Sequence, residues 1–227
     1  MLSIIVPAYN EEEGIVEILK ELKNVFKDED VEIICVDDGS KDKTAELAKT
    51  VKEIKVINYQ PNKGKDNAFY TGYKEAKGEW IGTIDSDLTY PPVEMLKMYN
   101  YVKNNHEIDI IIGSRFKKGF AKGLSLSRNL VNKLGALFFS LIFLKKITDL
   151  TTGLRIFKRK VSEIKVGTSG KVYGLDYEAG LSGEVIKRKM KYIEMAIESR
   201  PRAGQSKLAF FKNIFYFSLS AFKGRWL

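Results

Sequence analysis

The sequence contains very little cysteine and histidine, the residues on which disulfide-stabilised and zinc-binding proteins depend. Its 227 residues include one cysteine, Cys35, and one histidine, His106. A lone cysteine excludes a disulfide within the chain, and no cysteine–histidine spacing typical of a structural zinc site is present. Cys35 lies in an apolar run, where a thiol is usually inert packing, and His106 lies in a polar stretch expected at the surface.

Hydrophobic runs long enough to cross a membrane are also missing. The apolar run Leu134–Leu144 is far shorter than the roughly 20 residues that span a bilayer. The aromatic segment 208–227 is interrupted by lysine, asparagine and arginine, and predicts an amphipathic helix lying in a membrane surface. The alternative, for this segment and for the helix expected over Leu130–Ile147, is a helix packed in the core of the domain. The N-terminal residues 1–7 lack a leader pattern and are interpreted as the first strand of a cytosolic domain.

The composition is that of a globular protein with a basic surface. Hydrophobic residues make up 44% and charged residues 30% of the chain, and lysine and arginine outnumber aspartate and glutamate 38 to 29, for a net charge of +9. The length suits one large domain. The positive excess indicates anionic partners, which include nucleic acid, an acidic membrane surface and phosphorylated substrates.

Short β-branched runs alternate with helical spacing over residues 2–113. The apolar runs are Leu2–Val6, Val31–Val36, Ile54–Ile57, Trp80–Ile84 and Ile108–Ile112. This alternation predicts an α/β fold with a mostly parallel, Rossmann-like sheet and helices on both faces. Beyond residue 113 we expect a basic, glycine-rich loop over 117–128, helices at Leu130–Ile147 and Asp176–Arg188, and a strand at Tyr192–Ile197.

Two carboxylates follow the fourth apolar run in the sequence Asp85-Ser86-Asp87. Ligands gather outside the carboxyl ends of the strands in an open parallel sheet. If the chain stays extended, Asp85 and Asp87 point to the same side and converge on one hard divalent cation, Mg²⁺ or Mn²⁺ holding a diphosphate. A pair of solvated loop aspartates is the alternative for such a motif on its own.

Other polar groups are expected at the same edge. Asp37 and Asp38 end the second strand, where carboxylates commonly bind a ribose diol, and Arg115 ends the fifth, where a guanidinium can hold a phosphate. The basic turn Asn62–Lys65 fits either a phosphate contact or plain surface. Neither a G-x-x-x-x-G-K loop nor a G-x-G-x-x-G turn is present, so nucleotide binding would depend on metal and side chains.

Seven motifs occur in an order that resembles a known family: Pro7-Ala8-Tyr9-Asn10-Glu11, Val36-Asp37-Asp38-Gly39-Ser40, Asn62-Lys63-Gly64-Lys65, Asp85-Ser86-Asp87-Leu88-Thr89-Tyr90-Pro91-Pro92, Gly113-Ser114-Arg115, Asp149-Leu150-Thr151-Thr152-Gly153-Leu154-Arg155 and Gly204-Gln205-Ser206-Lys207-Leu208. The set is similar to that of family 2 inverting glycosyltransferases, and within them to the branch that makes polyprenyl-phosphate (dolichyl-phosphate) sugars. The resemblance covers nearly the whole chain.

The resemblance implies a GT-A fold, a nucleotide-sugar donor and Mg²⁺ or Mn²⁺. The residues that match the family's site are Pro7, Tyr9, Glu11, Asp37 and Asp38 for base and ribose, Asp85, Ser86 and Asp87 for metal and diphosphate, and Arg115, Arg128, Arg200 or Arg202, Ser206 and Lys207 for donor or acceptor phosphate. Asp87, Arg115 and Arg128 are the expected catalytic residues. Thr89 stands where mannose synthases usually carry a metal-binding glutamine, so its role as a ligand is open.

The resemblance predicts transfer of a hexose from GDP-mannose, UDP-glucose or UDP-N-acetylglucosamine to a polyprenyl phosphate at the cytoplasmic face of the membrane, by a peripheral enzyme. Residues 1–207 would form the catalytic domain and 208–227 the membrane-interface segment. One alternative is transfer to a saccharide or protein hydroxyl, with Asp149, Asp176 or Glu178 as the base. A non-catalytic nucleotide-sugar-binding adaptor is another. Nucleic-acid binding is not expected, because no reading motif accompanies the basic residues. The oligomeric state is open.

Overall fold

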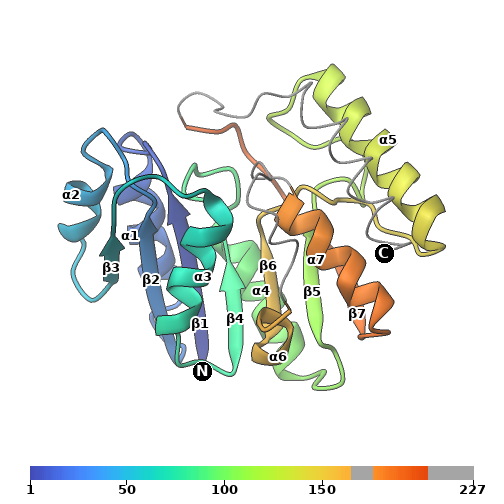
Figure 1. Ribbon diagram of the computed structural model, residues 1–227, viewed down its shortest axis with the longest axis horizontal. Helices are drawn as coiled ribbons and strands as arrows, with labels where there is room; N and C mark the ends of the chain where they lie inside the picture. The colour runs from blue at the N-terminus through green and yellow to red at the C-terminus, as the bar shows by residue number, and fades with distance from the viewer. Residues whose placement is uncertain (165–175, 204–227) are drawn as a thin grey trace.

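The computed structural model describes residues 1–164 and 176–203, drawn in colour in Figure 1. The strands are β1 Leu2–Ala8, β2 Val31–Asp37, β3 Lys55–Asn58, β4 Trp80–Thr83, β5 Ile110–Ser114, β6 Arg155–Lys158 and β7 Tyr192–Ala196. The helices are α1 Ile15–Val25, α2 Thr44–Lys49, α3 Lys65–Glu75, α4 Pro92–Lys103, α5 Leu126–Phe143, α6 Arg159–Ser162 and α7 Asp176–Lys187. The expected alternation of strands and helices is confirmed.

All seven strands form one sheet in the order β3-β2-β1-β4-β6-β5-β7. The strands β1 to β4 are parallel to one another, and β5 is parallel to β7. The short strand β6 runs antiparallel between β4 and β5. The sheet is therefore mostly parallel, as predicted, but its two parallel parts are joined by a strand that the sequence pattern did not indicate.

Helices cover both faces of the sheet (Figure 1). On one face, α1, α2 and α4 pack on side chains such as Leu2, Ile4 and Val6. On the other face, α3 and α7 pack on their strand neighbours, which include Ile5 and Val36. Alternate residues of β1 thus enter opposite cores, which is why its apolar run is continuous.

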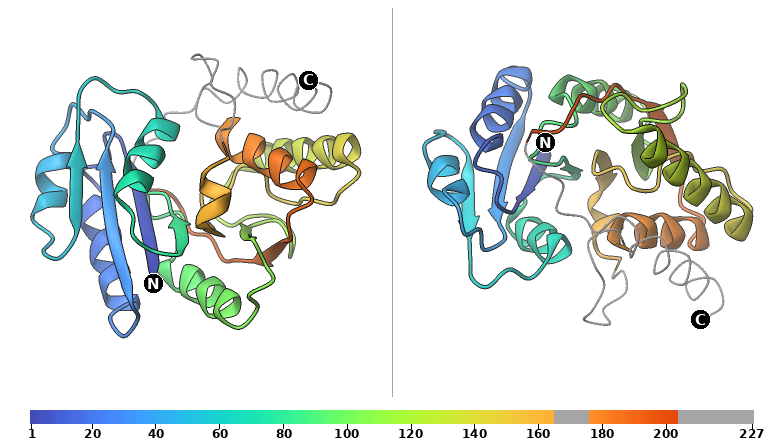
Figure 2. Two further views of the ribbon diagram at one scale, coloured as in Figure 1. Left: turned by 60° about the horizontal axis from the view of Figure 1, so that its bottom comes forward. Right: turned by 90° about the horizontal axis from the view of Figure 1, so that it is seen from above.

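Helix α5 lies outside these layers, alongside α7 (Figure 2). Its inner side packs Ala136 and Phe139 against Ile147, Leu150 and Ala179. Its outer side is exposed, so α5 is not a fully enclosed core helix. Among the described residues, no helix combines the length and apolarity that a membrane-spanning segment requires. The predicted amphipathic segment 208–227 lies outside the described residues.

The strand directions bring an end of every one of the seven strands to one edge of the sheet. The carboxyl ends of β1, β2, β3 and β4 lie there, together with those of β5 and β7. Because β6 is antiparallel, it begins at this edge, where Arg155 pairs with Thr83 of β4 and Ile112 of β5. The turn 149–154 that precedes β6 therefore meets the residues that follow β4.

Candidate functional site

The two aspartates of the D-x-D motif lie on a turn rather than on a strand. Strand β4 ends at Thr83, and residues 86–87 form a turn, so the prediction that extended alternation aims both carboxylates is wrong. Leu88 adopts a left-handed conformation with φ 64°, and the Thr89 N–H donates to Asp87 Oδ1 at 3.0 Å. The turn, not the pleat of a strand, fixes the Asp87 carboxylate.

Asp85 shares a lysine with a carboxylate from the far half of the chain. Lys65, the first residue of α3, places its Nζ 2.7 Å from Asp85 Oδ1 and 2.7 Å from Glu178 Oε1 of α7. Burial disfavours the charge of this ammonium, but the two carboxylates outweigh burial and raise the pKa of Lys65 above its ordinary value. The turn is therefore not plain surface at Lys65, and its contact with a phosphate stays a prediction.

Asp87 pairs with an arginine that follows β7. Arg202 Nη1 lies 3.0 Å from Asp87 Oδ2, and Arg202 Nη2 also donates to Glu11 Oε1. Arg200 instead points to α1, where its Nη1 donates to Glu21 Oε1 at 3.1 Å. The sequence left these two arginines undecided, and of their two side chains the structure pairs that of Arg202 with an aspartate of the D-x-D turn.

The charge of Asp85 influences Asp87. Burial raises the pKa of Asp87, and the neighbouring charge of Asp85 raises it further, while Arg202 and the Thr89 N–H oppose the shift. A pair of close, partly desolvated carboxylates favours a cation between or beside them. Asp85 is thus close enough to affect Asp87, and the convergence of both carboxylates on one cation stays a prediction.

Gly153 determines how closely the turn before β6 approaches Asp85. A Cβ atom at this position would lie 2.3 Å from Asp85 Oδ1, so no other residue fits without displacing the carboxylate. The Gly153 N–H donates to the buried Tyr90 hydroxyl at 3.2 Å. Burial raises the pKa of Tyr90 to about 12, which keeps the hydroxyl neutral.

Arg115 at the end of β5 is held by Asp149. Its Nε donates to Asp149 Oδ2 at 2.7 Å, and its Nη2 donates to Asp149 Oδ1 at 2.8 Å and to the Thr151 hydroxyl at 2.7 Å. Burial opposes the charge, but Asp149 dominates and raises the pKa of Arg115. Both oxygens of Asp149 therefore accept from a permanently charged guanidinium, a poor arrangement for a general base.

Asp37 and Asp38 make hydrogen bonds within the loops at the carboxyl edge. Asp37 accepts from the Ser40 hydroxyl and, at 3.2 Å, from the Ser40 N–H. Asp38 accepts from the Tyr59 hydroxyl at 2.7 Å, and its carboxylate also holds the turn 62–64, through the Gly64 N–H at 2.8 Å among others. Asp38 thereby fixes the turn that presents Lys65.

The remaining predicted residues fall in several places. Pro7 is buried in β1, Tyr9 is half-buried just beyond it, Glu11 is 9% exposed beside Arg202, and Ser86 is buried in the D-x-D turn. Thr89 is half-buried, and its carbonyl accepts from the Arg200 N–H at 3.0 Å. Arg128 lies in the first turn of α5, where its N–H donates to Ser125 Oγ at 3.4 Å. Ser206 and Lys207 lie outside the described residues.

Three residues that sequence reasoning did not place in the site are central to its structure. Gly153 and Tyr90 belong to motifs that were recognised, but only the fold shows that they contact each other. Arg155 is fully buried and donates to the carbonyls of Leu150, Thr152 and Glu178. The sequence gave no signal that this charged residue is buried, and Arg155 was noticed only as the last residue of the Asp149–Arg155 motif.

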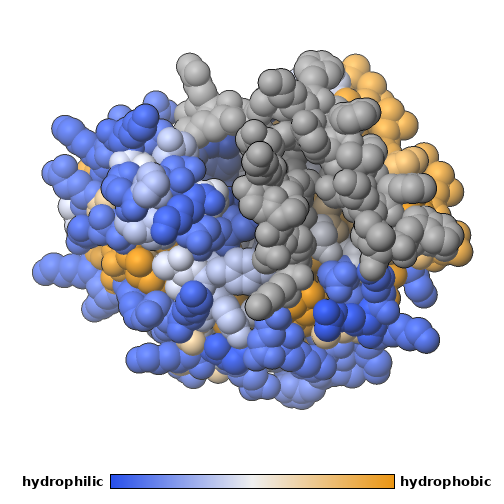
Figure 3. All heavy atoms as spheres, in the orientation of Figure 1, coloured by the Kyte–Doolittle hydropathy of each residue, from blue (hydrophilic) through white to orange (hydrophobic). Residues whose placement is uncertain are grey.

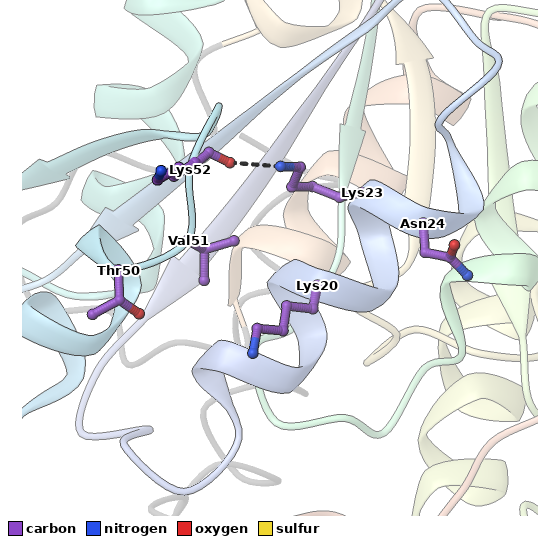
Figure 4. Close-up of a pocket in the computed structure, with 6 residues that line it drawn as sticks. All are labelled: Lys20, Lys23, Asn24, Thr50, Val51 and Lys52. Carbon is purple, nitrogen blue, oxygen red and sulfur yellow. Dashed lines mark hydrogen bonds between the residues drawn. The ribbon is translucent and has the colours of Figure 1, made fainter.

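A shallow pocket is found elsewhere, between α1 and the turn after α2 (Figure 4). Its lining residues are Lys20, Lys23, Asn24, Thr50, Val51 and Lys52. Lys23 closes part of it by donating to the Lys52 carbonyl at 2.9 Å. None of the sequence motifs contributes to this pocket, so the chemistry is concentrated at the carboxyl edge.

The chain belongs to glycosyl transferase family 2, whose model matches residues 3–164. A relative is the dolichol-phosphate mannosyltransferase of Pyrococcus furiosus, which is 35% identical over 169 residues, 71% of this chain and 47% of the relative. The low-salt glycan biosynthesis hexosyltransferase Agl6 of Haloferax volcanii is 27% identical over 215 residues, 92% of this chain and 50% of the relative. The chain thus spans about half the length of these relatives, and the matches fit the predicted dolichol-phosphate sugar synthase branch.

Solved structures confirm the GT-A fold. Glucosyl-3-phosphoglycerate synthase from Mycobacterium tuberculosis, crystallised with Mg²⁺ and UDP, superposes with a TM-score of 0.76 at 16% identity, covering 100% of this chain and 80% of that one. The same enzyme with Mn²⁺, UDP and glucosyl-3-phosphoglycerate gives a TM-score of 0.73 at 17% identity, with the same coverage. At this identity the likeness establishes the fold alone.

Proposed function

We propose that this chain transfers a hexose from a nucleotide sugar to a polyprenyl phosphate. The observation that carries the proposal is the D-x-D turn, where each carboxylate is paired with one cation: Asp85 with Lys65 and Asp87 with Arg202, at the carboxyl edge of a GT-A sheet. Glu178 shares Lys65 and Glu11 shares Arg202, so the cluster is acidic overall and would take a divalent cation, which in turn would bind a diphosphate. Membership of glycosyl transferase family 2 supports a nucleotide-sugar donor. The names of two relatives, a dolichol-phosphate mannosyltransferase and a hexosyltransferase, support a polyprenyl-phosphate acceptor and transfer of a hexose.

The residues present fit a divalent cation shared with a substrate. In the described ranges 1–164 and 176–203, no three acidic, histidine or cysteine side chains gather to hold a metal by themselves. Mg²⁺ is usually bound through one or two carboxylates and completed by substrate phosphates, and Asp85 and Asp87 supply the two carboxylates. The bound ion would neutralise charge on the departing nucleoside diphosphate. Mn²⁺ accepts the same oxygen donors.

The side chains around the turn would divide the remaining work. If a cation shared the two aspartates, Lys65 and Arg202 would be released from part of their ion pairs and would be available to pair with diphosphate oxygens. The Asp37 and Glu11 carboxylates are placed at neighbouring strand ends, where they would bind the nucleoside. Arg115 precedes the basic loop 117–128 and Arg128 ends it, and both would offset repulsion between two phosphorylated substrates.

A polyprenyl phosphate needs no catalytic base. Its phosphate is already an anionic nucleophile, with a second pKa of about 6 as in phosphomonoesters. Asp149, one of the candidate bases, is already engaged by Arg115, which fits a reaction that does not use it as a base. Because a polyprenyl phosphate is embedded in a lipid bilayer, the enzyme would bind the cytoplasmic face of the membrane as a peripheral protein.

The test is to incubate the chain with GDP-mannose, UDP-glucose and UDP-N-acetylglucosamine, each with a short-chain polyprenyl phosphate and Mg²⁺ or Mn²⁺. We expect one donor to yield a polyprenyl-phosphate sugar and chelation by EDTA to stop the reaction. Transfer that continues undiminished in EDTA would contradict the role of the metal. Absence of any polyprenyl-linked product across the panel would contradict the acceptor.

One observation favours a second candidate function, transfer to a hydroxyl acceptor with Glu178 as the base. Glu178 is 3% exposed, and within the part of the chain that the structure describes its Oε2 is buried without a hydrogen-bond partner. A carboxylate oxygen in that state is suited to accept a proton. Glu178→Gln distinguishes the two: it should abolish transfer to a hydroxyl but leave a substantial rate with a phosphate nucleophile.

A further inference from the structure

Helix α5 displays most of the large apolar side chains that the described residues expose. They are Leu126, Leu130, Leu134, Leu137, Phe138, Leu141 and Leu144. Their spacing of three and four residues places them on one face of the helix. Figure 3 shows the corresponding apolar surface over α5, at the upper right of the molecule. Scattered exposed leucines are ordinary, but a contiguous apolar face indicates a binding partner.

The exposed face is not required to hold α5 in place. The opposite side supplies the packing: Phe139 is 1% exposed, its ring stacks on Phe143 with centroids 4.3 Å apart, and Ala136 is buried beside it. Ser125 caps the helix, and Asn129 binds the preceding loop by accepting from the Ala121 N–H at 2.8 Å. The fold thus accounts for the inner residues of α5 and leaves the outer leucines unexplained.

Leu144 is the most exposed of these residues, at 75%. It ends α5 in a left-handed conformation with φ 52°, a position where glycine is usual and a large apolar residue is disfavoured. Neither hydration nor backbone geometry favours leucine here. Lys145 and Lys146 follow it and are exposed.

The segment that carries this face has charged side chains of one sign, although two of them pair with carboxylates from elsewhere, Arg115 with Asp149 and Lys122 with Glu198. Residues 115–146 contain no aspartate or glutamate, and their basic residues are Arg115, Lys117, Lys118, Lys122, Arg128, Lys133, Lys145 and Lys146. Lys133 lies 4.4 Å from the ring centroid of Phe120, which is 53% exposed and extends the apolar surface. A helix with an apolar face bordered by lysines matches the requirements of an anionic lipid surface.

We propose that the outer face of α5, with Phe120 and the flanking lysines, is a docking surface for an anionic lipid bilayer. The inference rests on the proposed function only for its purpose, which is to bring the enzyme to a lipid-linked acceptor. A second copy of this chain fits the surface less well, because an isologous interface would bring Lys133, Lys145 and Lys146 of two copies toward each other. Bilayer phosphates complement that charge, and the acyl boundary accepts the leucines.

The surface is connected directly to the D-x-D turn. The segment that carries it begins at Arg115 and returns at Asp149, and these two residues are paired. After Asp149 the chain reaches Gly153, beside Asp85. Docking through α5 would therefore place the carboxyl edge of the sheet close to the lipid headgroups, where a polyprenyl phosphate presents its anionic end.

The experiment measures co-sedimentation of the full chain with phosphatidylcholine vesicles that contain phosphatidylglycerol. We expect the chain to bind, and the variant Leu134→Gln/Leu137→Gln/Leu141→Gln to bind at least about tenfold more weakly, because three leucines leave the acyl boundary. The matched control is Val93→Gln/Tyr101→Gln, which removes exposed apolar side chains from α4. It should bind as the unchanged chain does.

A charge variant separates the two parts of the surface. Lys145→Gln/Lys146→Gln should weaken binding to the anionic vesicles about tenfold and have little effect with phosphatidylcholine alone. Thermal melting by circular dichroism checks that each variant is folded. If the leucine variant is folded and sediments like the unchanged chain, or if the unchanged chain does not bind, the docking surface is refuted.

Light scattering tests the alternative that the outer face of α5 forms a dimer. In lipid-free buffer the unchanged chain and the leucine variant should have the same mass. A dimer that the leucine variant dissociates, with vesicle binding unaltered, would overturn the inference.

The sedimentation assay also separates this inference from the proposed function. It needs no sugar donor, so its result stands even if no transfer is detected. Where transfer is detected, the leucine variant should retain activity on a water-soluble short-chain acceptor and lose activity on a long-chain acceptor in vesicles.

Discussion

The two halves of the sheet are built by different rules. Residues 2–103 form four parallel strands with short connections, and every apolar run of this part becomes a strand. Residues 110–203 combine two parallel strands with the antiparallel β6 and a long excursion that contains α5. Regular βα units bury their apolar residues on both faces, whereas the second half leaves an apolar helix face exposed.

The comparison indicates a division of roles. The first half supplies both carboxylates of the D-x-D turn, and the second half supplies the groups that surround them: Gly153 against Asp85, Glu178 through Lys65, and Arg202 on Asp87. In the proposed function, the first half binds the donor and the second half adapts the site to an acceptor. The following predictions test that division.

The largest effect is expected from the first half. Asp87→Asn removes the negative charge that pairs with Arg202, and we expect kcat/KM for sugar transfer to fall about a thousandfold, several kcal/mol of lost stabilisation. The control is Asp30→Asn, whose side chain is 79% exposed, with a change of less than about twofold. Steady-state kinetics decides, and full activity in Asp87→Asn would exclude the metal assignment.

Arg155 should matter most for the stability of the second half. Arg155→Met leaves the carbonyls of Leu150, Thr152 and Glu178 buried without this donor, so the free energy of unfolding should fall by about 3 kcal/mol. Urea unfolding followed by circular dichroism measures it. Lys146→Met, at an exposed position, should change the free energy by less than about 0.5 kcal/mol.

Arg202 and Arg200 form a matched pair within one short segment. We expect Arg202→Met to lower kcat/KM about a hundredfold, because it removes the cation on Asp87, and Arg200→Met to lower it less than about threefold, because its partner is Glu21. Equal losses of kcat/KM in the two variants would show that residues 200–202 have only a structural role.

The smallest effect concerns the core of the first half. Burial, and then the charge of Asp37, raise the pKa of Cys35 to about 12, so the thiol stays neutral at about pH 8 and the reactive thiolate is nearly absent. We expect almost no reaction with a thiol reagent in the native state and full reaction in denaturant. Rapid native labelling would reveal opening of the sheet around β2.

Much of the first half could be predicted from the sequence because its signals are local. The strand Val31–Val36 was expected and β2 ends one residue later, and the run Leu2–Val6 lies within β1. In the second half, β6 was missed because its four residues begin and end with charged side chains. A short strand between two others is stabilised by its neighbours, not by its own pattern.

The candidate site was predictable as a set of motifs but not as a set of contacts. Strand ends at one edge explain why Asp37, Asp85 and Arg115 were expected together. The pairing of Lys65 with Glu178 joins residues separated by 113 positions, and nothing local distinguishes Arg202 from Arg200. Such choices depend on which loops face each other after the sheet has formed, and the expected roles of individual residues stay predictions for the kinetics above.

The segment between β5 and β6 leaves the sheet and returns to it at the same edge. Its two ends are held together by the Ser114–Thr148 hydroxyl pair at 2.6 Å and by the Arg115–Asp149 ion pair. Because the ends are held together, lengthening the chain between them costs little entropy and disturbs the sheet little. The segment between β5 and β6 can therefore vary during evolution while the sheet stays the same. Glycosyltransferases of this architecture could in this way change their docking surface without changing the carboxylates of the D-x-D turn.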